Sequence, residues 1–218
     1  MPPPVKPRPY RSPLRERRAQ ETRAAILDAA ERLFSEHGYV RTRLSDVADA
    51  AGVSPATVKL VFGTKPDLLL SVWHRTLAGG LDDQVPVADR SWYRAIFETP
   101  DPAEALRLNA HIATVVRNRV AGLAQVIEIA AAVDDEIAAL QSKMSGEFYE
   151  NQRRVINHLH AGGHLRPDLT VEDATDLLWT INNGRIYFML VHDRGWSPDK
   201  YEQWLAAALR RELLGDVG

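Results

Sequence analysis

The chain has 218 residues, enough for one large domain or two smaller ones. Its 45% hydrophobic and 26% charged residues are typical of a folded globular protein, and the absence of cysteine excludes disulfides, thiolate metal sites and cysteine nucleophiles. No apolar run is as long as a membrane span, and the proline-rich, basic start is unlike a secretory signal, so we expect a cytoplasmic protein.

The net charge of −2 hides an uneven distribution. Residues 1–75 contain 13 Lys and Arg against 8 Asp and Glu, a balance of +5, and the remaining residues contain 14 against 21, a balance of −7. A basic N-terminal part on an acidic body predicts that the N-terminal part binds a polyanion. The alternative is uneven surface charge without a function, and charge alone does not decide between the two.

Residues 1–14 are rich in proline, carry Lys6, Arg8 and Arg11, and contain almost nothing to bury. We predict a mobile basic arm. Two roles stay open for it. Arg8 and Arg11 enter the minor groove of DNA beside a binding site, or the arm is a solvated tail that only aids solubility.

Residues 15–37 follow a helical pattern, with Ile26, Ala30, Leu33 and Phe34 on one face. Gly38 then ends the helix, since glycine adopts positive φ without a steric penalty.

Three helices follow closely. We expect Thr42 to cap the first, which carries Leu44, Val47 and Ala48 and ends at Gly52. In the second, Ser54 is the cap, Pro55 takes the first position, and Val58 and Phe62 point inward. Thr64 and Asp67 predict a capping box at the start of the third, which extends to about residue 78.

The remaining sequence is also helical in pattern. Residues 79–91 suggest a loop, and Asp101 followed by Pro102 marks a helix start whose apolar ladder extends to Val116. Further helices are predicted at about residues 123–132, 134–161, 171–192 and 198–214. Because alternation with a period of two is absent, the predicted fold is all-α.

Residues 44–62 meet the physical requirements of a helix-turn-helix. Ala48 is small enough for two helices to cross closely, Gly52 allows the tight turn, Val53 is an apolar plug, and Ser54 caps the next helix. The second helix is too short to serve core packing alone. In this motif it enters the major groove of DNA.

On these residues the sequence resembles the TetR family of transcriptional regulators. The resemblance covers residues 15–75, about a third of the chain, and rests on the order and spacing of Thr22 to Ala30, Leu33-Phe34, Gly38-Tyr39, Thr42, Val47-Ala48, Ala51 to Ser54, Thr57, Phe62, Lys65 and Leu68-Leu69. It implies a homodimer, a three-helix DNA-binding head and a larger helical body that binds an effector or partner. The expected divisions are a disordered arm at 1–14, a helix-turn-helix domain at 15–78 and an effector-binding and dimerisation domain at 79–218.

The resemblance also implies DNA-binding residues. Thr42 is similar to a phosphate-contacting threonine, and Lys65 occupies the position of a second backbone clamp. Arg43 stands where threonine is usual, and Lys59-Leu60-Val61 replaces the aromatic and histidine residues of many members, which leaves the operator sequence open. The expected recognition surface consists of Ser54, Pro55, Ala56, Thr57, Lys59 and Leu60.

We expect the body to hold an apolar pocket with a few polar groups. The candidate effector-binding residues are Trp92, Phe97, His111, Arg117, Trp179, Asn183 and Tyr187, with Tyr93 beside them, and for each of them ordinary core packing is the alternative. The two last helices are expected to pair with those of a second copy, although part of their apolar surface must serve the chain's own core.

The predicted function is a DNA-binding regulator of a palindromic operator, a repressor that a small-molecule effector releases; activators share the scaffold. We expect no cofactor and no metal, because Gly162-Gly163 interrupts the spacing of His160 and His164. Two alternatives stay open. One is a DNA-bound scaffold for a protein partner, and the other is an all-α enzyme, for which no catalytic motif is found.

Overall fold

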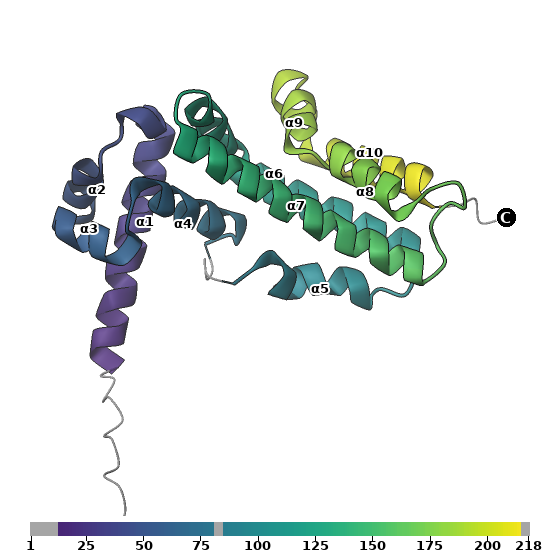
Figure 1. The fold of residues 1–218 in the computed structure, drawn as a ribbon, viewed down its shortest axis with the longest axis horizontal. Coiled ribbons are helices and arrows are strands. Elements are labelled where there is room, and N and C mark those ends of the chain that lie inside the picture. Colours follow the sequence, from purple (N-terminus) through teal and green to yellow (C-terminus); the bar gives the residue numbers. More distant parts are fainter. Residues whose placement is uncertain (1–12, 81–84, 215–218) are drawn as a thin grey trace, which may run out of the picture. The chain divides into compact units, whose positions relative to one another are not determined.

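The computed structural model describes residues 13–80 and 85–214, and these residues form helices joined by short loops (Figure 1). No strand occurs among them, and the sole extended pairing described is a bridge between Leu165 and Leu214. The predicted all-α class is therefore confirmed. Residues 1–12 of the predicted basic arm, with Arg8 and Arg11, lie outside the described residues. Residues 13 and 14 are not part of an arm, because they begin the first helix, where proline is well tolerated.

The chain divides into two compact units, the first ending at Leu69 and the second beginning at Leu70. This division falls inside a helix, whereas the boundary that we predict from the sequence, after residue 78, follows the end of the same helix. The first unit contains α1 (Pro13–Arg41), α2 (Leu44–Ala51) and α3 (Pro55–Phe62). Helix α4 (Lys65–Leu77) contains the boundary between the two units.

The core of the first unit forms on the predicted face of α1. Ile26, Ala30 and Phe34 are fully buried and Leu33 is nearly so. The helical backbone is interrupted at Gly38, where φ is 75° and ψ is 166°. A residue with a Cβ atom is strained at this positive φ. The interruption turns the chain so that the ring of Tyr39 packs against that of Phe34, with 5.8 Å between ring centroids.

Thr42 differs from its prediction as the cap of α2. Its side chain is 1% exposed, and its hydroxyl lies 2.9 Å from the carbonyl oxygen of Gly38 and 3.1 Å from that of Leu33. The N-cap of α2 is Arg43, whose backbone N–H donates to the Asp46 carboxylate at 2.9 Å. Thr42 thus ties the start of α2 to α1, because its hydroxyl lies within hydrogen-bond distance of two carbonyl oxygens of α1.

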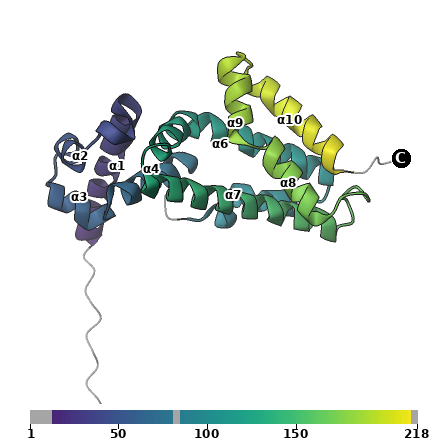
Figure 2. The same ribbon diagram turned by 45° about the horizontal axis from the view of Figure 1, so that its top comes forward.

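The second unit consists of long helices packed side by side. Its elements are a short 3-10 turn (Val87–Asp89), α5 (Ser91–Glu98), α6 (Pro102–Ala131), α7 (Asp135–Ala161), α8 (Val171–Ile181), α9 (Gly184–Tyr187), a π-helical segment (Phe188–Asp193) and α10 (Pro198–Leu213). The two views agree that α6 and α7 run alongside each other, with α8 and α10 on one side (Figures 1 and 2). Helix α6 packs against α5, α7 and α10, and α8 packs against α7 and α10.

Three elements differ from the sequence-based expectation. Helix α6 is one continuous helix through Gly122, since a single glycine weakens a helix interior by about 1 kcal/mol without breaking it. The helix predicted at 171–192 instead ends at Ile181 and resumes at Gly184. Helix α5 was not predicted, because residues 91–98 follow a loop-like stretch and are few.

The capping box at the start of α4 is present as predicted. The Thr64 N–H and hydroxyl donate to the Asp67 carboxylate at 3.0 and 2.7 Å, and the Asp67 N–H donates to the Thr64 hydroxyl at 3.3 Å. These bonds lower the pKa of Asp67 below its ordinary value of 3.8. A carboxyl with a depressed pKa contributes stability that is present above its ordinary pKa and is lost as the pH falls through its folded-state pKa.

Replacing Asp67 with alanine should therefore lower the free energy of unfolding by about 1 kcal/mol at neutral pH. The difference from the wild type should shrink as the pH falls below 3.8, because the wild-type carboxyl then protonates. Urea unfolding of both proteins at several pH values measures the effect. Asp49→Ala, at an exposed position in α2, is the control, and a difference that stays constant with pH would contradict this account.

Candidate DNA interface and effector pocket

The turn between α2 and α3 is built from the backbone. Gly52 adopts the left-handed conformation, with φ 67° and ψ 33°, and the Val53 N–H donates to the Ala48 carbonyl at 3.0 Å. Val47 and Ala48 are fully buried, so α2 lies close to the core. The geometry is the tight helix-turn-helix that the sequence predicts, and it leaves the start of α3 free to face outward.

Helix α3 has one buried and one exposed face. The Ser54 hydroxyl accepts from the Thr57 N–H at 3.1 Å and caps the helix. Val58 is fully buried and Phe62 is 7% exposed, so both anchor the helix, as predicted. Leu60 is 87% exposed, the most exposed large apolar side chain of the described residues. A leucine exposed to this degree contributes little to the core, and its contact with DNA stays a prediction.

The structure brings most of the predicted DNA-binding residues to the surface. Arg43, Ser54, Pro55, Ala56, Lys59 and Leu60 are exposed, and Thr57 and Lys65 are half-buried. The Lys65 ammonium lies 3.9 Å from the centroid of the Tyr39 ring, which places its charge at the first turn of α4. Thr42 is the exception. It is 1% exposed, and its hydroxyl lies within hydrogen-bond distance of the carbonyl oxygens of Leu33 and Gly38, while its contact with phosphate stays a prediction.

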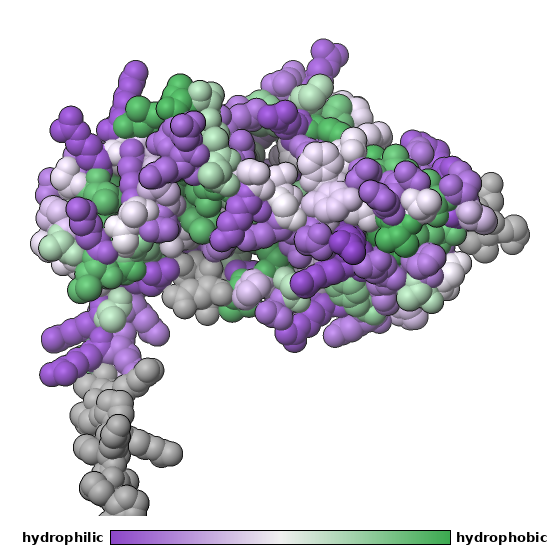
Figure 3. Space-filling view, in the orientation of Figure 1, coloured by the Kyte–Doolittle hydropathy of each residue, from purple (hydrophilic) through white to green (hydrophobic). Residues whose placement is uncertain are grey.

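The second unit contains a pocket of about 850 Å³. Its walls come from α6, α7, α8, α9 and the π-helical segment, with Trp73 of α4 contributing as well. Figure 3 shows a hollow in the surface beside α9, on a face that is otherwise largely hydrophilic. The volume is in the range of small-molecule sites.

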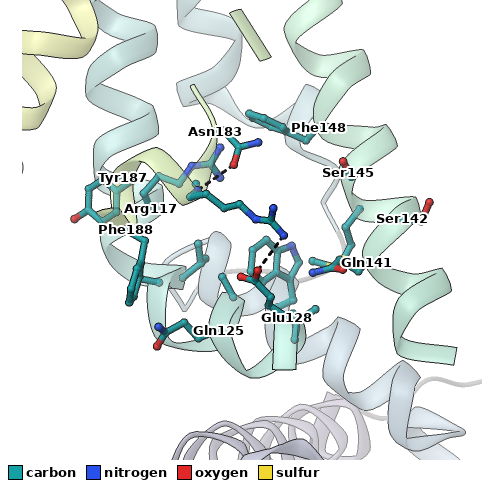
Figure 4. A pocket seen from close by; sticks show the side chains of 18 of the residues that line it. Arg117, Gln125, Glu128, Gln141, Ser142, Ser145, Phe148, Asn183, Tyr187 and Phe188 are labelled. Carbon is teal, nitrogen blue, oxygen red and sulfur yellow. Dashed lines mark hydrogen bonds and ion pairs between the residues drawn. The ribbon is translucent and has the colours of Figure 1, made fainter. Parts of the chain in front are cut away.

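Four of the seven predicted effector residues line this pocket: Arg117, Trp179, Asn183 and Tyr187. In the close view, Arg117, Asn183 and Tyr187 lie on one side, and Gln141, Ser142 and Ser145 lie on α7 opposite (Figure 4).

Arg117 is held in the pocket wall by groups other than carboxylates. Its Nη2 donates to the main-chain oxygen of Asn182 at 2.8 Å, and its guanidinium carbon lies 4.7 Å from the centroid of the Phe148 ring. Its Nε is buried and has no hydrogen-bond partner among the described residues. Burial lowers the pKa of Arg117 below its ordinary value, although an arginine remains protonated in proteins.

A cluster of buried amides lies behind Arg117. The Asn182 side chain is 3% exposed, and its amide nitrogen lies 3.2 Å from the Gln152 side-chain oxygen and 3.5 Å from that of Asn109. Asn183 then caps α9, since its side-chain oxygen accepts from the Arg185 N–H at 3.0 Å. The Asn183 side chain thus satisfies a backbone N–H that the interrupted helix would leave unpaired, whereas the Asn182 amide nitrogen bonds to side-chain oxygens and its Oδ1 has no partner among the described residues.

Trp92, Phe97 and His111 do not line the pocket. Trp92 and Phe97 are on α5, where the Phe97 ring packs against that of His158 at 5.3 Å and borders a smaller hollow of about 380 Å³. His111 pairs with Glu202 of α10 at 3.0 Å. Because α6 is continuous, His111 lies about 9 Å along the helix from Arg117 and faces a different direction.

The wall contributed by α7 was missed from the sequence. Its lining residues include Ala138, Ser142 and Ser145, three small side chains on one face, followed by Phe148. A row of small side chains in a long helix leaves space beside the helix. The spacing of these small residues is the sequence signal that could have indicated the pocket wall. The same spacing also occurs where two helices cross closely, so it does not distinguish a pocket from a helix crossing. Trp73 and Phe188 were also missed.

Among residues 13–80 and 85–214, no three histidine or acidic side chains are grouped as a metal site would need. The helices of the same described segments include none with the length and apolar character required to cross a membrane.

Two family comparisons match separate parts of the chain. Residues 26–72 match the family described as bacterial regulatory proteins, tetR family, and residues 127–214 match the BetI-type transcriptional repressor, C-terminal. The first match contains α2 and α3, and the second contains most of the pocket wall.

Individual proteins resemble the chain over most of its length. The HTH-type transcriptional regulator AcrR of Shigella flexneri is 29% identical over 197 residues, which are 87% of this chain and 80% of AcrR. The crystal structure of NalD, the secondary repressor of the MexAB-OprM multidrug efflux pump in Pseudomonas aeruginosa, is 22% identical, with a TM-score of 0.65 over 92% of this chain and 100% of NalD. A transcriptional regulator from Saccharomonospora viridis, solved with choline, is also 22% identical, with a TM-score of 0.66 over 90% of this chain and 99% of that one.

The helix-turn-helix, the helical body and both family matches lead to one conclusion. The chain belongs to the TetR family of transcriptional regulators, which bind DNA and are not enzymes.

Proposed function

We propose that the protein is a homodimeric repressor that binds a palindromic operator through α3 and is released when a small molecule enters the 850 Å³ pocket. The observation that carries the DNA half is the two-faced α3, which is anchored by Val58 and Phe62 and presents Lys59 and Leu60 to solvent. Two copies related by a two-fold axis would place two such helices on two half-sites.

The DNA contacts divide by chemistry. Lys59 and Arg43 are exposed cations suited to phosphate, and Lys65 stands at a helix N-terminus, where backbone N–H groups also favour an anion. Leu60 is suited to the methyl group of thymine in the major groove. The proposal therefore assigns affinity to the cations and part of the base selection to Leu60.

The effector half is supported by the pocket and by the path of α4. Trp73 lines the pocket and belongs to the same helix as Lys65. Lys65 precedes Trp73 by eight residues, so the two residues lie about 12 Å apart along the helix axis. A molecule that displaces Trp73 therefore acts on the helix that carries a proposed phosphate contact. The NalD and Saccharomonospora structures, which are named as a repressor and as a choline complex, are consistent with a ligand-controlled regulator.

Selection of bound sequences from a random DNA pool tests the proposal directly. The expected result is enrichment of a palindrome with two half-sites about one helical turn apart. The oligomeric state is measured in the same preparation. If the protein is dimeric and no palindrome is enriched, the proposal is wrong.

Lys65→Ala should weaken binding to operator and non-operator DNA by the same factor, because a phosphate contact carries no sequence information. The slope of log affinity against log salt concentration should fall by about one unit. Lys143→Ala, at an exposed position on α7, is the control. A loss confined to one operator sequence would show that Lys65 contacts a base instead.

Leu60→Ala should leave the free energy of unfolding within about 0.5 kcal/mol of the wild type, because the side chain is 87% exposed. Affinity for the selected operator should fall about fivefold or more, while affinity for non-specific DNA is unchanged. Ile129→Ala, 70% exposed on α6, is the matched control. Operator binding by Leu60→Ala that equals the wild type would remove Leu60 from the interface.

A further inference from the structure

The charge inside the pocket is unbalanced. The lining residues include two arginines, Arg117 and Arg185, and one carboxylate, Glu128. Arg185 donates to Glu128 at 2.9 Å, and both side chains are more than half exposed, so this pair is neutral and faces water. The positive charge of Arg117 remains without a counter-charge in the lining.

Neighbouring groups do not balance Arg117. Its hydrogen-bond acceptor is a carbonyl oxygen, and its aromatic neighbour is Phe148. Tyr201 is the titratable side chain whose charge would affect Arg117. Its phenol is neutral, because burial raises the pKa of Tyr201 to about 12. Burial of an unpaired charge is costly, and a binding site is a place where that cost is offset by a ligand.

Two pocket-lining residues each carry a buried donor whose hydrogen bond is unsatisfied among the described residues. The Arg117 Nε and the Trp179 indole Nε1 are both buried without a hydrogen-bond partner among the described residues. Both residues line the pocket. Neither group can accept a hydrogen bond, so each requires an acceptor, and a carboxylate offers two acceptor oxygens.

The rest of the lining is mostly apolar. Trp73, Phe148 and Phe188 supply aromatic surface, and Val120 and Ile127 supply aliphatic surface. A ligand that fits this combination has an apolar body and one anionic end. A cation such as choline would meet the charge of Arg117 instead of a counter-charge.

We propose that the pocket binds an amphipathic organic carboxylate, with the carboxylate held by Arg117 and Trp179 and the apolar body against the aromatic wall. This inference rests on the proposed function only in that the pocket is the effector site. Arg117 then gains a counter-charge that residues 13–80 and 85–214 do not provide in the lining.

Matched probes test the charge preference without knowledge of the natural ligand. Benzoate, 2-naphthoate and decanoate are each compared with the uncharged primary amide of the same body, and choline is the cationic probe. Calorimetry on the full chain gives the affinities. At least one carboxylate should bind about tenfold or more tightly than its amide, since a hydrogen bond to a charged group is strong.

Variants of Arg117 test whether this residue causes the preference for carboxylates over amides. Arg117→Met keeps the apolar stem and should abolish the advantage of carboxylate over amide, whereas Arg117→Lys should keep part of it. Arg119→Met, at an exposed position on the same helix, should bind as the wild type does. If Arg117→Met does not fold, the wild-type probe pairs and Arg117→Lys still decide the question.

The inference is overturned if no carboxylate binds, if the amides bind as tightly as the carboxylates, or if choline binds more tightly than all three. Release of the selected operator, measured with the same probes, separates this inference from the proposed function. Carboxylates that bind without releasing DNA would support the anion site and contradict effector-controlled release. Release by neutral or cationic molecules alone would support effector control and contradict the anion site.

Discussion

The hydrogen bond from the Arg117 guanidinium to the Asn182 carbonyl oxygen ties α6 to the point where α8 ends. The last carbonyl groups of a helix lack partners within it, and a cation near them is favourable. With that carbonyl satisfied and the Asn182 amide bonded to Gln152, the chain can break inside a buried region and resume at α9. The pocket depends on this break, because residues on both sides of it line the pocket.

The same residue therefore has two electrostatic tasks. Arg117 stabilises a helix end through one nitrogen, and another of its nitrogens has no hydrogen-bond partner in the described part of the chain. A protein that needed only the helix end could use a neutral donor there at lower cost of burial. Retaining a full charge at this position is reasonable if an anion completes the site.

Short-range chemistry made the first unit predictable. Glycines that need positive φ, polar caps and the spacing of Val58 and Phe62 act within a few residues, so the sequence predicts α3 and its two faces. Thr42 shows the limit. Its residue type and position predict a helix cap, but its hydroxyl bonds to carbonyl groups of α1. One of these carbonyl groups belongs to Leu33, nine residues earlier. Capping preferences consider only the residues next to a helix end, so they do not predict this contact.

In the second unit, tertiary packing decides what sequence patterns leave open. The sequence predicts a helix boundary near Gly122 and one continuous helix through the Asn182-Asn183 pair, yet α6 continues past Gly122 and α8 ends at Ile181. The difference is that buried Gln152 and Asn109 supply partners at Asn182. Tertiary packing also separates His111 from Arg117. The sequence predicts both as effector-binding residues, because both are polar residues on an apolar helix. The position of α10 instead pairs His111 with Glu202.

Helix α4 sets how a pocket event can act on DNA. A ligand shifts an equilibrium only by the difference in its affinity for the two states, so some pocket residue must differ between the DNA-bound and released forms. Trp73 is suited to this, because it lines the pocket and shares a 13-residue helix with Lys65. Arg117 lies on α6 and bonds to the end of α8, within the body. In our proposal, affinity for the ligand resides in Arg117 and the effect on DNA is assigned to Trp73, so the two properties can change independently.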